Sequence, residues 1–93
     1  MILIYAISRS KQFTRDYKLA EKKNLDMSLL DDVILQLAQN IKLDKKYKNH
    51  SLSGKYAGTS ECHIQPNWLL VYKIDISLKV LYLIRTGTHS DLF

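Results

Sequence analysis

Three histidines, His50, His63 and His89, are the side chains of this 93-residue chain best suited to acid–base chemistry. Imidazole has an ordinary pKa of about 6.5, so it can accept or donate a proton near neutral pH. Arg85 stands four residues before His89 and is the only arginine after residue 15. Its planar guanidinium matches the geometry of a phosphate group. These residue types favour chemistry on a phosphodiester.

Two imidazoles and a guanidinium are sufficient to cleave RNA without a metal. One imidazole would take the proton of a ribose 2′-OH, and the oxygen would then attack the adjacent phosphorus. The second imidazole would protonate the leaving 5′-oxygen, while the arginine stabilised the charge on phosphorus. Each proton transfer is typically worth about 10²- to 10⁴-fold in rate. The products would be a 2′,3′-cyclic phosphate and a 5′-OH, and DNA would not react.

The same histidines also have simpler interpretations. Three histidines in a chain of this length are near the background frequency, and a single surface histidine usually does no chemistry. Three imidazoles can bind zinc, but no two of these have the i, i+4 spacing of a helical metal site, so we predict no metal and no cofactor. Cys62 is the only cysteine, which excludes an internal disulfide.

Positive charge is concentrated in two blocks of the sequence, within a net charge of +5. Residues 9–23 carry six basic and two acidic groups, and residues 42–55 carry five lysines and one aspartate. Such blocks fit a polyanionic partner such as nucleic acid, and they fit a solvated lysine-rich face equally well. The loop lysines that could contact an RNA backbone are Lys42, Lys45, Lys46 and Lys48.

Two aromatic residues, Trp68 and Phe93, are candidates for stacking on the bases of single-stranded RNA. Phe93 ends the printed sequence after a short polar segment. Trp68 begins a predicted strand, where a tryptophan is ordinarily a core residue. The sequence therefore leaves Trp68 open between an RNA contact and a core position.

Hydrophobic patterning predicts which elements carry these residues. Residues 2–7 predict a strand, and a first helix follows, capped by Ser8 or Ser10. Apolar residues at i, i+3, i+4 and i+7 predict a second helix over 27–40, capped by Asp26. Two helices joined by a short link form an αα-hairpin.

The second half of the chain predicts strands joined by loops. Residues 42–55 lack periodicity and predict an exposed loop, and strands are expected over 56–64, 68–74 and 79–85, before a polar tail at 86–93. In the first of these strands, alternation places Glu61 and His63 on one face and Cys62 and Ile64 on the other. Cys62 is therefore expected to point into the core.

This order predicts one α+β domain over residues 1–93. It has an N-terminal strand, a two-helix hairpin and then an antiparallel β-meander, with the helices packed on one face of the sheet. No apolar run approaches the roughly 20 residues of a membrane span, and the apolar N-terminus lacks the basic region of a signal peptide. We therefore expect a cytoplasmic protein that does not contact a membrane.

Four segments, taken together, resemble the YafQ branch of the RelE superfamily of bacterial toxins. They are YKNHSLSG at 47–54, ECHIQPNW at 61–68, LVYK at 70–73 and RTGTHSDLF at 85–93. The length and the order of elements are similar too, so the resemblance covers nearly the whole chain and implies a RelE-like fold.

The resemblance implies the toxin half of a type II toxin–antitoxin pair. Such a toxin is a ribosome-dependent endoribonuclease that cuts mRNA in the decoding site. Its partners would be the ribosome, mRNA and a cognate antitoxin of the DinJ kind, of ribbon-helix-helix type, with operator DNA bound only through the antitoxin complex.

The family's active-site residues match residues of this chain. Its histidines match His50, His63 and His89, and its phosphate-contacting arginine matches Arg85. We assign His50 as general base and His89 as general acid, roles that can be exchanged, and His63 to the phosphate beside Arg85. The family's C-terminal aromatic and strand-initial tryptophan match the two candidates for base stacking named above.

One position departs from the family. A His-x-x-Pro-Asp turn is common there, and this chain has Asn67 in place of the aspartate. Asparagine forms hydrogen bonds but cannot exchange a proton at neutral pH. If the aspartate only positions a neighbour, Asn67 suffices. If it is essential, the chain is a weak enzyme that acts mainly with its antitoxin in operon repression. Gyrase inhibition, as in the related ParE branch, fits the fold but does not need the histidines.

Overall fold

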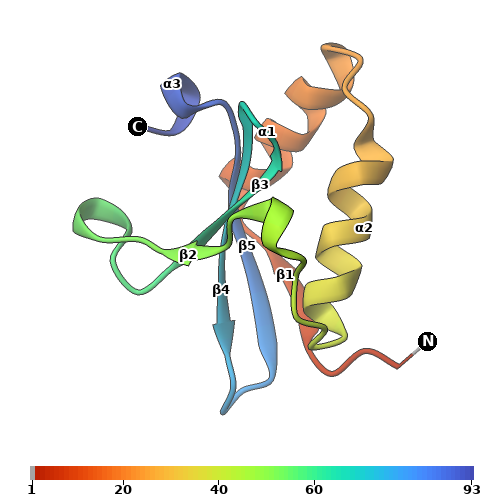
Figure 1. Cartoon of the computed structure of the whole chain (residues 1–93), viewed down its shortest axis with the longest axis vertical. Helices are drawn as coiled ribbons and strands as arrows, with labels where there is room; N and C mark the ends of the chain where they lie inside the picture. Colours follow the sequence, from red (N-terminus) through yellow and green to blue (C-terminus); the bar gives the residue numbers. More distant parts are fainter. Residues whose placement is uncertain (1) are drawn as a thin grey trace.

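The computed structural model describes residues 2–93 and contains one five-stranded sheet with the strand order β1-β5-β4-β3-β2 (Figure 1). β1 runs parallel to β5, and the other neighbouring strands are antiparallel. In chain order the elements are β1 (Ala6–Arg9), α1 (Lys11–Lys22), α2 (Met27–Ala38), the 3-10 turn η1 (Lys45–Tyr47), β2 (His50–Ser51), the 3-10 turn η2 (Gly54–Tyr56), β3 (Ser60–Gln65), β4 (Trp68–Asp75), β5 (Val80–Gly87) and α3 (His89–Leu92).

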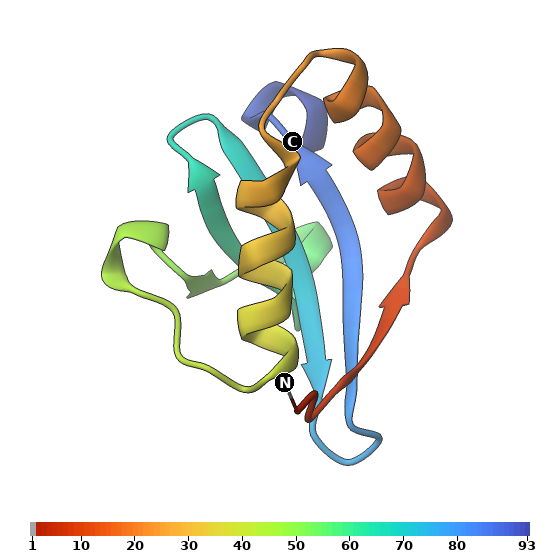
Figure 2. The same cartoon turned by 90° about the vertical axis from the view of Figure 1, so that its right-hand side faces the viewer.

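The predicted α+β order is confirmed: strand, two helices, then a meander of β3, β4 and β5 with α1 and α2 on one side of the sheet (Figures 1 and 2). The predicted cap at Ser10 is present, because its hydroxyl accepts a hydrogen bond from the Phe13 N–H at 2.9 Å. Asp26 caps α2 in the same way, through the Ser28 N–H at 3.1 Å. Within residues 2–93, no helix has the length and apolar character needed to cross a membrane.

The first predicted strand begins later than expected. Residues 2–4 are exposed, and the N–H groups of Ile4 and Tyr5 bind the Ala38 carbonyl at the end of α2, at 2.8 and 3.0 Å. Pairing with β5 starts only at Ala6, opposite Val80. The apolar N-terminal residues therefore indicated extended chain correctly, but the partner strand decides where the sheet begins.

The polar tail ends in a short helix that the sequence did not predict. Thr88 and Asp91 form a capping box: the Thr88 hydroxyl accepts from the Asp91 N–H at 3.2 Å, and the Asp91 carboxylate accepts from the Thr88 N–H at 2.9 Å. These hydrogen bonds hold the pKa of Asp91 below its ordinary value. A helix this short has no periodic pattern, so only the capping box could have indicated it.

Both faces of the sheet carry apolar packing. The main core lies between the sheet and helices α1 and α2, and it includes the fully buried Phe13, Leu30 and Cys62. A smaller cluster on the other face joins Leu69 and Val71 to other apolar residues, namely Leu92 of α3 and the partly buried Leu52, Tyr56 and Ile84. In Figure 1 the segment after β2 and helix α3 lie on this second side. This second side carries the candidate site.

Candidate active site

The three predicted histidines come together on the face of the sheet opposite α1 and α2. The ring centroids of His50 and His63 are 6.3 Å apart, and those of His63 and His89 are 5.9 Å apart. His63 therefore lies between the other two rings along this row. Residues that are separated by up to 39 positions in the sequence thus share one small surface.

Strand pairing and a helix start bring the rings together. β2 places His50 opposite Glu61 of β3, and His63 follows two residues later on the same face of β3. His63 pairs in turn with Leu69, which belongs to the smaller apolar cluster on this side. His89 is the first residue of α3, so the capping box of that helix also sets the position of its ring.

Glu61 is the residue of this site that the sequence reasoning did not identify as functional. Its side chain is buried, with the residue 3% exposed. Oε1 lies 3.5 Å from Nε2 of His50 and 3.6 Å from Nε2 of His63. The period-two alternation placed Glu61 beside His63, but only the pairing of β2 with β3 adds the second imidazole and the burial. The Glu61 carboxylate therefore lies within ion-pair distance of both imidazoles.

The tautomer of His50 follows from its other nitrogen. Nδ1 lies 2.7 Å from the backbone carbonyl of Lys48. A carbonyl can only accept, so Nδ1 carries a proton in this arrangement. Proton exchange by His50 therefore takes place at Nε2, the nitrogen that faces Glu61.

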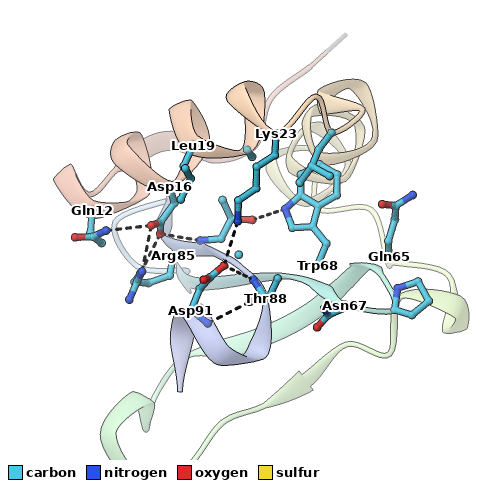
Figure 3. Close-up of a pocket in the computed structure, with 15 residues that line it drawn as sticks. Gln12, Asp16, Leu19, Lys23, Gln65, Asn67, Trp68, Arg85, Thr88 and Asp91 are labelled. Atoms are coloured by element: carbon cyan, nitrogen blue, oxygen red, sulfur yellow. Dashed lines mark hydrogen bonds and ion pairs between the residues drawn. The ribbon is translucent and has the colours of Figure 1, made fainter.

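Arg85 is held firmly at the edge of this region. Its Nε and Nη2 donate to the two carboxylate oxygens of Asp16 on α1, at 2.9 and 3.1 Å (Figure 3). Asp16 is the main reason that the pKa of Arg85 is raised, and the Tyr56 hydroxyl contributes to the same shift. The Tyr56 ring packs edge-on against Phe93, 5.4 Å between centroids, and Phe93 lies 6.2 Å from the His89 ring. Arg85 is thus connected to the histidines through two aromatic rings.

The two candidate stacking residues differ in accessibility. Phe93 is 61% exposed beside His89 and is available to a nucleotide base. Trp68 is only 3% exposed, and its Nε1 donates to the Thr86 hydroxyl at 3.0 Å in the core. Stacking of Trp68 on RNA is therefore ruled out in this conformation. Of the two interpretations that the sequence left open, the structure favours the core position.

Replacing Trp68 by phenylalanine is expected to destabilise the fold by about 1–3 kcal/mol, because it removes a buried hydrogen bond and leaves space around Thr86. The Thr86 hydroxyl itself donates to the Leu69 carbonyl at 2.7 Å, so the bond belongs to a buried chain. Urea unfolding of the two proteins measures the difference. Unchanged stability together with weaker RNA binding would contradict the core assignment.

Asn67 is exposed in the turn between β3 and β4. With Asp16 and Arg85 it lines a cleft of about 710 Å³ between α1, α3 and this turn (Figure 3). The imidazoles are not among the described residues that line this cleft. The structure therefore groups Asn67 with the arginine side of the region.

The loop lysines divide between two places. All four are exposed, and Lys46 and Lys48 line a cleft of about 420 Å³ that also contains His63. Lys42 and Lys45 line another cleft, which Lys48 also borders and which does not include the imidazoles among its described residues. Only one pair of the predicted lysines therefore lies next to the site.

In residues 2–93, no group of three or more His, Cys, Asp or Glu residues is arranged to hold a metal ion. Cys62 is fully buried, which confirms its expected core position, and burial, with a smaller effect from Glu61, raises the pKa of its thiol to about 12. Because the thiolate is the nucleophilic form, Cys62 is not a candidate nucleophile.

Comparison with known proteins agrees with this fold. Residues 5–93 match the family model for the bacterial toxin of type II toxin–antitoxin systems, YafQ. The chain is 40% identical over 88 residues to the mRNA interferase toxin YafQ of Escherichia coli strain K12, covering 94% of each chain. It is 31% identical over 90 residues to the putative toxin YafQ of Haemophilus influenzae, covering 91% of this chain and 88% of that one.

Solved structures show the same likeness. The E. coli DinJ–YafQ complex contains a chain with a TM-score of 0.88 at 39% identity, covering 96% of this chain and 98% of that one. A metal-bound toxin from Helicobacter pylori gives a TM-score of 0.90 at 41% identity, covering 99% of this chain and 100% of that one. The fold and these matches thus define a toxin of the type II toxin–antitoxin class. Within that class, the chain belongs to the YafQ family, which confirms the resemblance seen in the sequence.

Proposed function

We propose that this chain is an mRNA interferase, an endoribonuclease that cleaves mRNA on the ribosome without a metal ion. The observation that carries the proposal is the row of imidazoles from three chain segments on one partly open surface. The E. coli relative that matches 94% of this chain is an mRNA interferase toxin. The relative indicates the substrate class, and the row of rings supplies the groups for the reaction.

In the proposed mechanism, His50 takes the proton of the ribose 2′-OH at Nε2. Its Nδ1 is already occupied by the Lys48 carbonyl, and the Glu61 carboxylate 3.5 Å from Nε2 stabilises the imidazolium that forms. The 2′-oxygen attacks phosphorus, and the bond from phosphorus to the 5′-oxygen breaks. His89 gives its proton to that leaving oxygen, so the products are a 2′,3′-cyclic phosphate and a 5′-OH.

His63 and Arg85 would bind the phosphate between the acid and the base. His63 lies within about 6 Å of both neighbouring rings, measured between centroids. The Arg85 guanidinium keeps N–H donors beyond those that Asp16 uses, and these can stabilise charge on the pentacovalent phosphorus. Phe93 is the exposed aromatic face against which a neighbouring base would stack.

The proposed partners follow from the same relatives and from charge. YafQ of E. coli is solved as a complex with DinJ, so we propose a cognate antitoxin of that kind, with operator DNA bound only through the complex. Lys46 and Lys48 beside His63 would contact the phosphate backbone of mRNA or ribosomal RNA. All of these partners are found in the cytoplasm, where we place the protein.

The proposal is tested by in vitro translation with the purified chain, followed by primer extension and analysis of the product ends. We expect cleavage of mRNA only when ribosomes are translating it, and products with 2′,3′-cyclic phosphate and 5′-OH ends. In a second assay, polyamines hold the two ribosomal subunits together while EDTA removes divalent metal ions. We expect EDTA to leave the cleavage rate unchanged in that assay. Equal cleavage of free RNA would contradict ribosome dependence. A 3′-phosphate formed without a cyclic intermediate would contradict the mechanism.

The weak-enzyme alternative rests on Asn67. Asn67 lines the cleft that Arg85 also lines, and the three imidazoles come together without it, which favours the active enzyme. Growth arrest on expression that His89→Ala relieves would support the enzyme, and arrest that persists in this variant would support a binding role.

A further inference from the structure

We propose that Asp16 is a positioning residue for the cleavage reaction: it fixes the plane of the Arg85 guanidinium and so directs the remaining N–H groups toward the scissile phosphate. The inference rests on the proposed function. Asp16 lies on α1, outside the four segments that carry the family resemblance, and nothing in its sequence neighbourhood suggests a part in catalysis.

The contact between Asp16 and Arg85 has the geometry of a bidentate pair. Oδ2 accepts from Nε at 2.9 Å and Oδ1 accepts from Nη2 at 3.1 Å (Figure 3). Two parallel hydrogen bonds to one carboxylate fix the rotation of a guanidinium as well as its place. A single hydrogen bond, or an ion pair alone, would leave that rotation free.

The carboxylate is itself held rigidly. Asp16 is 8% exposed, and it also accepts from the Thr86 N–H at 3.1 Å and from Gln12 Nε2 at 3.0 Å. At the start of α1 the Ser10 hydroxyl donates to the Ile84 carbonyl at 2.7 Å, next to Arg85 in the chain. Helix α1 and strand β5 are therefore joined on both sides of the pair, so the side chain that holds the arginine has little freedom of its own.

Arg85 keeps N–H donors that Asp16 does not engage. A guanidinium has five N–H donors, and Asp16 engages one on Nε and one on Nη2, so both protons of Nη1 and the second proton of Nη2 remain. Tyr56 is close enough to Arg85 to influence it and also packs on Phe93, which lies against His89. The free donors and the imidazoles are thus linked through neighbouring rings.

A purely structural role would not require this arrangement. Burying two charges has a desolvation cost that their attraction often fails to exceed, so a buried ion pair is weak evidence for a stabilising role. Apolar residues could join α1 to β5 equally well. Positioning explains why a charged, bidentate contact occurs here.

The test compares single-turnover cleavage at saturating ribosomes for the wild type, Asp16→Asn, Asp16→Glu and Arg85→Ala, with Asp16→Asn also made in the Arg85→Ala protein. We expect Asp16→Asn to lower the rate at saturation about ten- to a hundredfold, the effect of misplacing a reacting group by about 1 Å. Asp16→Glu keeps the carboxylate and should retain more activity. In the Arg85→Ala protein, Asp16→Asn should have no further effect on the rate.

Asp31→Asn is the matched control, because Asp31 also accepts a side-chain hydrogen bond, from the Tyr17 hydroxyl at 2.9 Å, but is exposed on α2. We expect its cleavage rate to be unchanged. Melting temperatures and the folded fraction of every variant are measured so that rates refer to folded protein.

Three results would overturn the inference. One is an Asp16→Asn rate per folded molecule equal to that of the wild type, and another is an equal loss with and without Arg85. The third is an Arg85→Ala variant with full activity while His89→Ala is inactive. That result would overturn the role of Asp16 but would leave the proposed function intact. A wild-type chain that does not cleave mRNA under any condition would instead overturn the proposed function itself.

Discussion

Replacing His89 by alanine is expected to lower the rate of mRNA cleavage by about 10²- to 10⁴-fold, because it removes the general acid that protonates the leaving 5′-oxygen. The capping box of α3 uses Thr88 and Asp91, not the imidazole, so the helix should remain folded. Single-turnover cleavage of a defined ribosomal complex measures the rate. Ser90→Ala, a change at the next residue of the same short helix, is the control and should cleave at the wild-type rate.

A substrate with sulfur in place of the leaving 5′-oxygen separates the acid from the base. A thiolate leaves without protonation, so this substrate should restore most of the lost rate to His89→Ala. The same substrate should not restore His50→Ala, which lacks the group that takes the 2′-OH proton. Rescue of His50→Ala and not of His89→Ala would exchange the two roles, and an unchanged rate in His89→Ala would remove His89 from the mechanism.

These experiments depend on the meeting of three histidines from separate chain segments, which the sequence could predict only in part. Local patterns predicted the elements well: the spacing of Leu30, Val33, Ile34 and Leu37 predicted α2, and the cap at Ser10 was confirmed. The row of imidazoles depends instead on the pairing of β2 with β3 and on the position of α3. Such contacts are non-local, so the family resemblance predicted them and the periodicity did not.

The contacts that orient the site were the least predictable. Asp16 and Arg85 are 69 positions apart, and no local pattern connects a helix residue to a residue so distant in the chain. Alternation placed Glu61 on the same face as His63, but it could not show that the carboxylate is buried or that His50 reaches it. Residue type and order therefore indicated the groups that react, while the groups that hold them required the three-dimensional structure.

Replacing Glu61 by glutamine is expected to lower the cleavage rate by about 100- to 1,000-fold, because it removes the negative charge beside Nε2 of His50 that stabilises the imidazolium formed in the reaction. Glutamine has nearly the same size, so the buried space stays filled. A buried carboxylate is costly to desolvate, and the free energy of unfolding should therefore stay the same or rise. Cleavage rate and urea unfolding, measured in the same buffer, test both halves of the prediction.

The opposite changes in activity and stability are the informative part of this prediction. Functional sites often retain groups that the fold alone would not favour, and removing them raises stability as activity falls. Glu21→Gln, the same chemical change at an exposed position of α1, should alter neither quantity. If Glu61→Gln unfolded far more easily and its rate per folded molecule matched the wild type, Glu61 would be a structural residue. In that case the base, whichever imidazole it is, would act without help from the Glu61 carboxylate, because both His50 and His63 lie beside it.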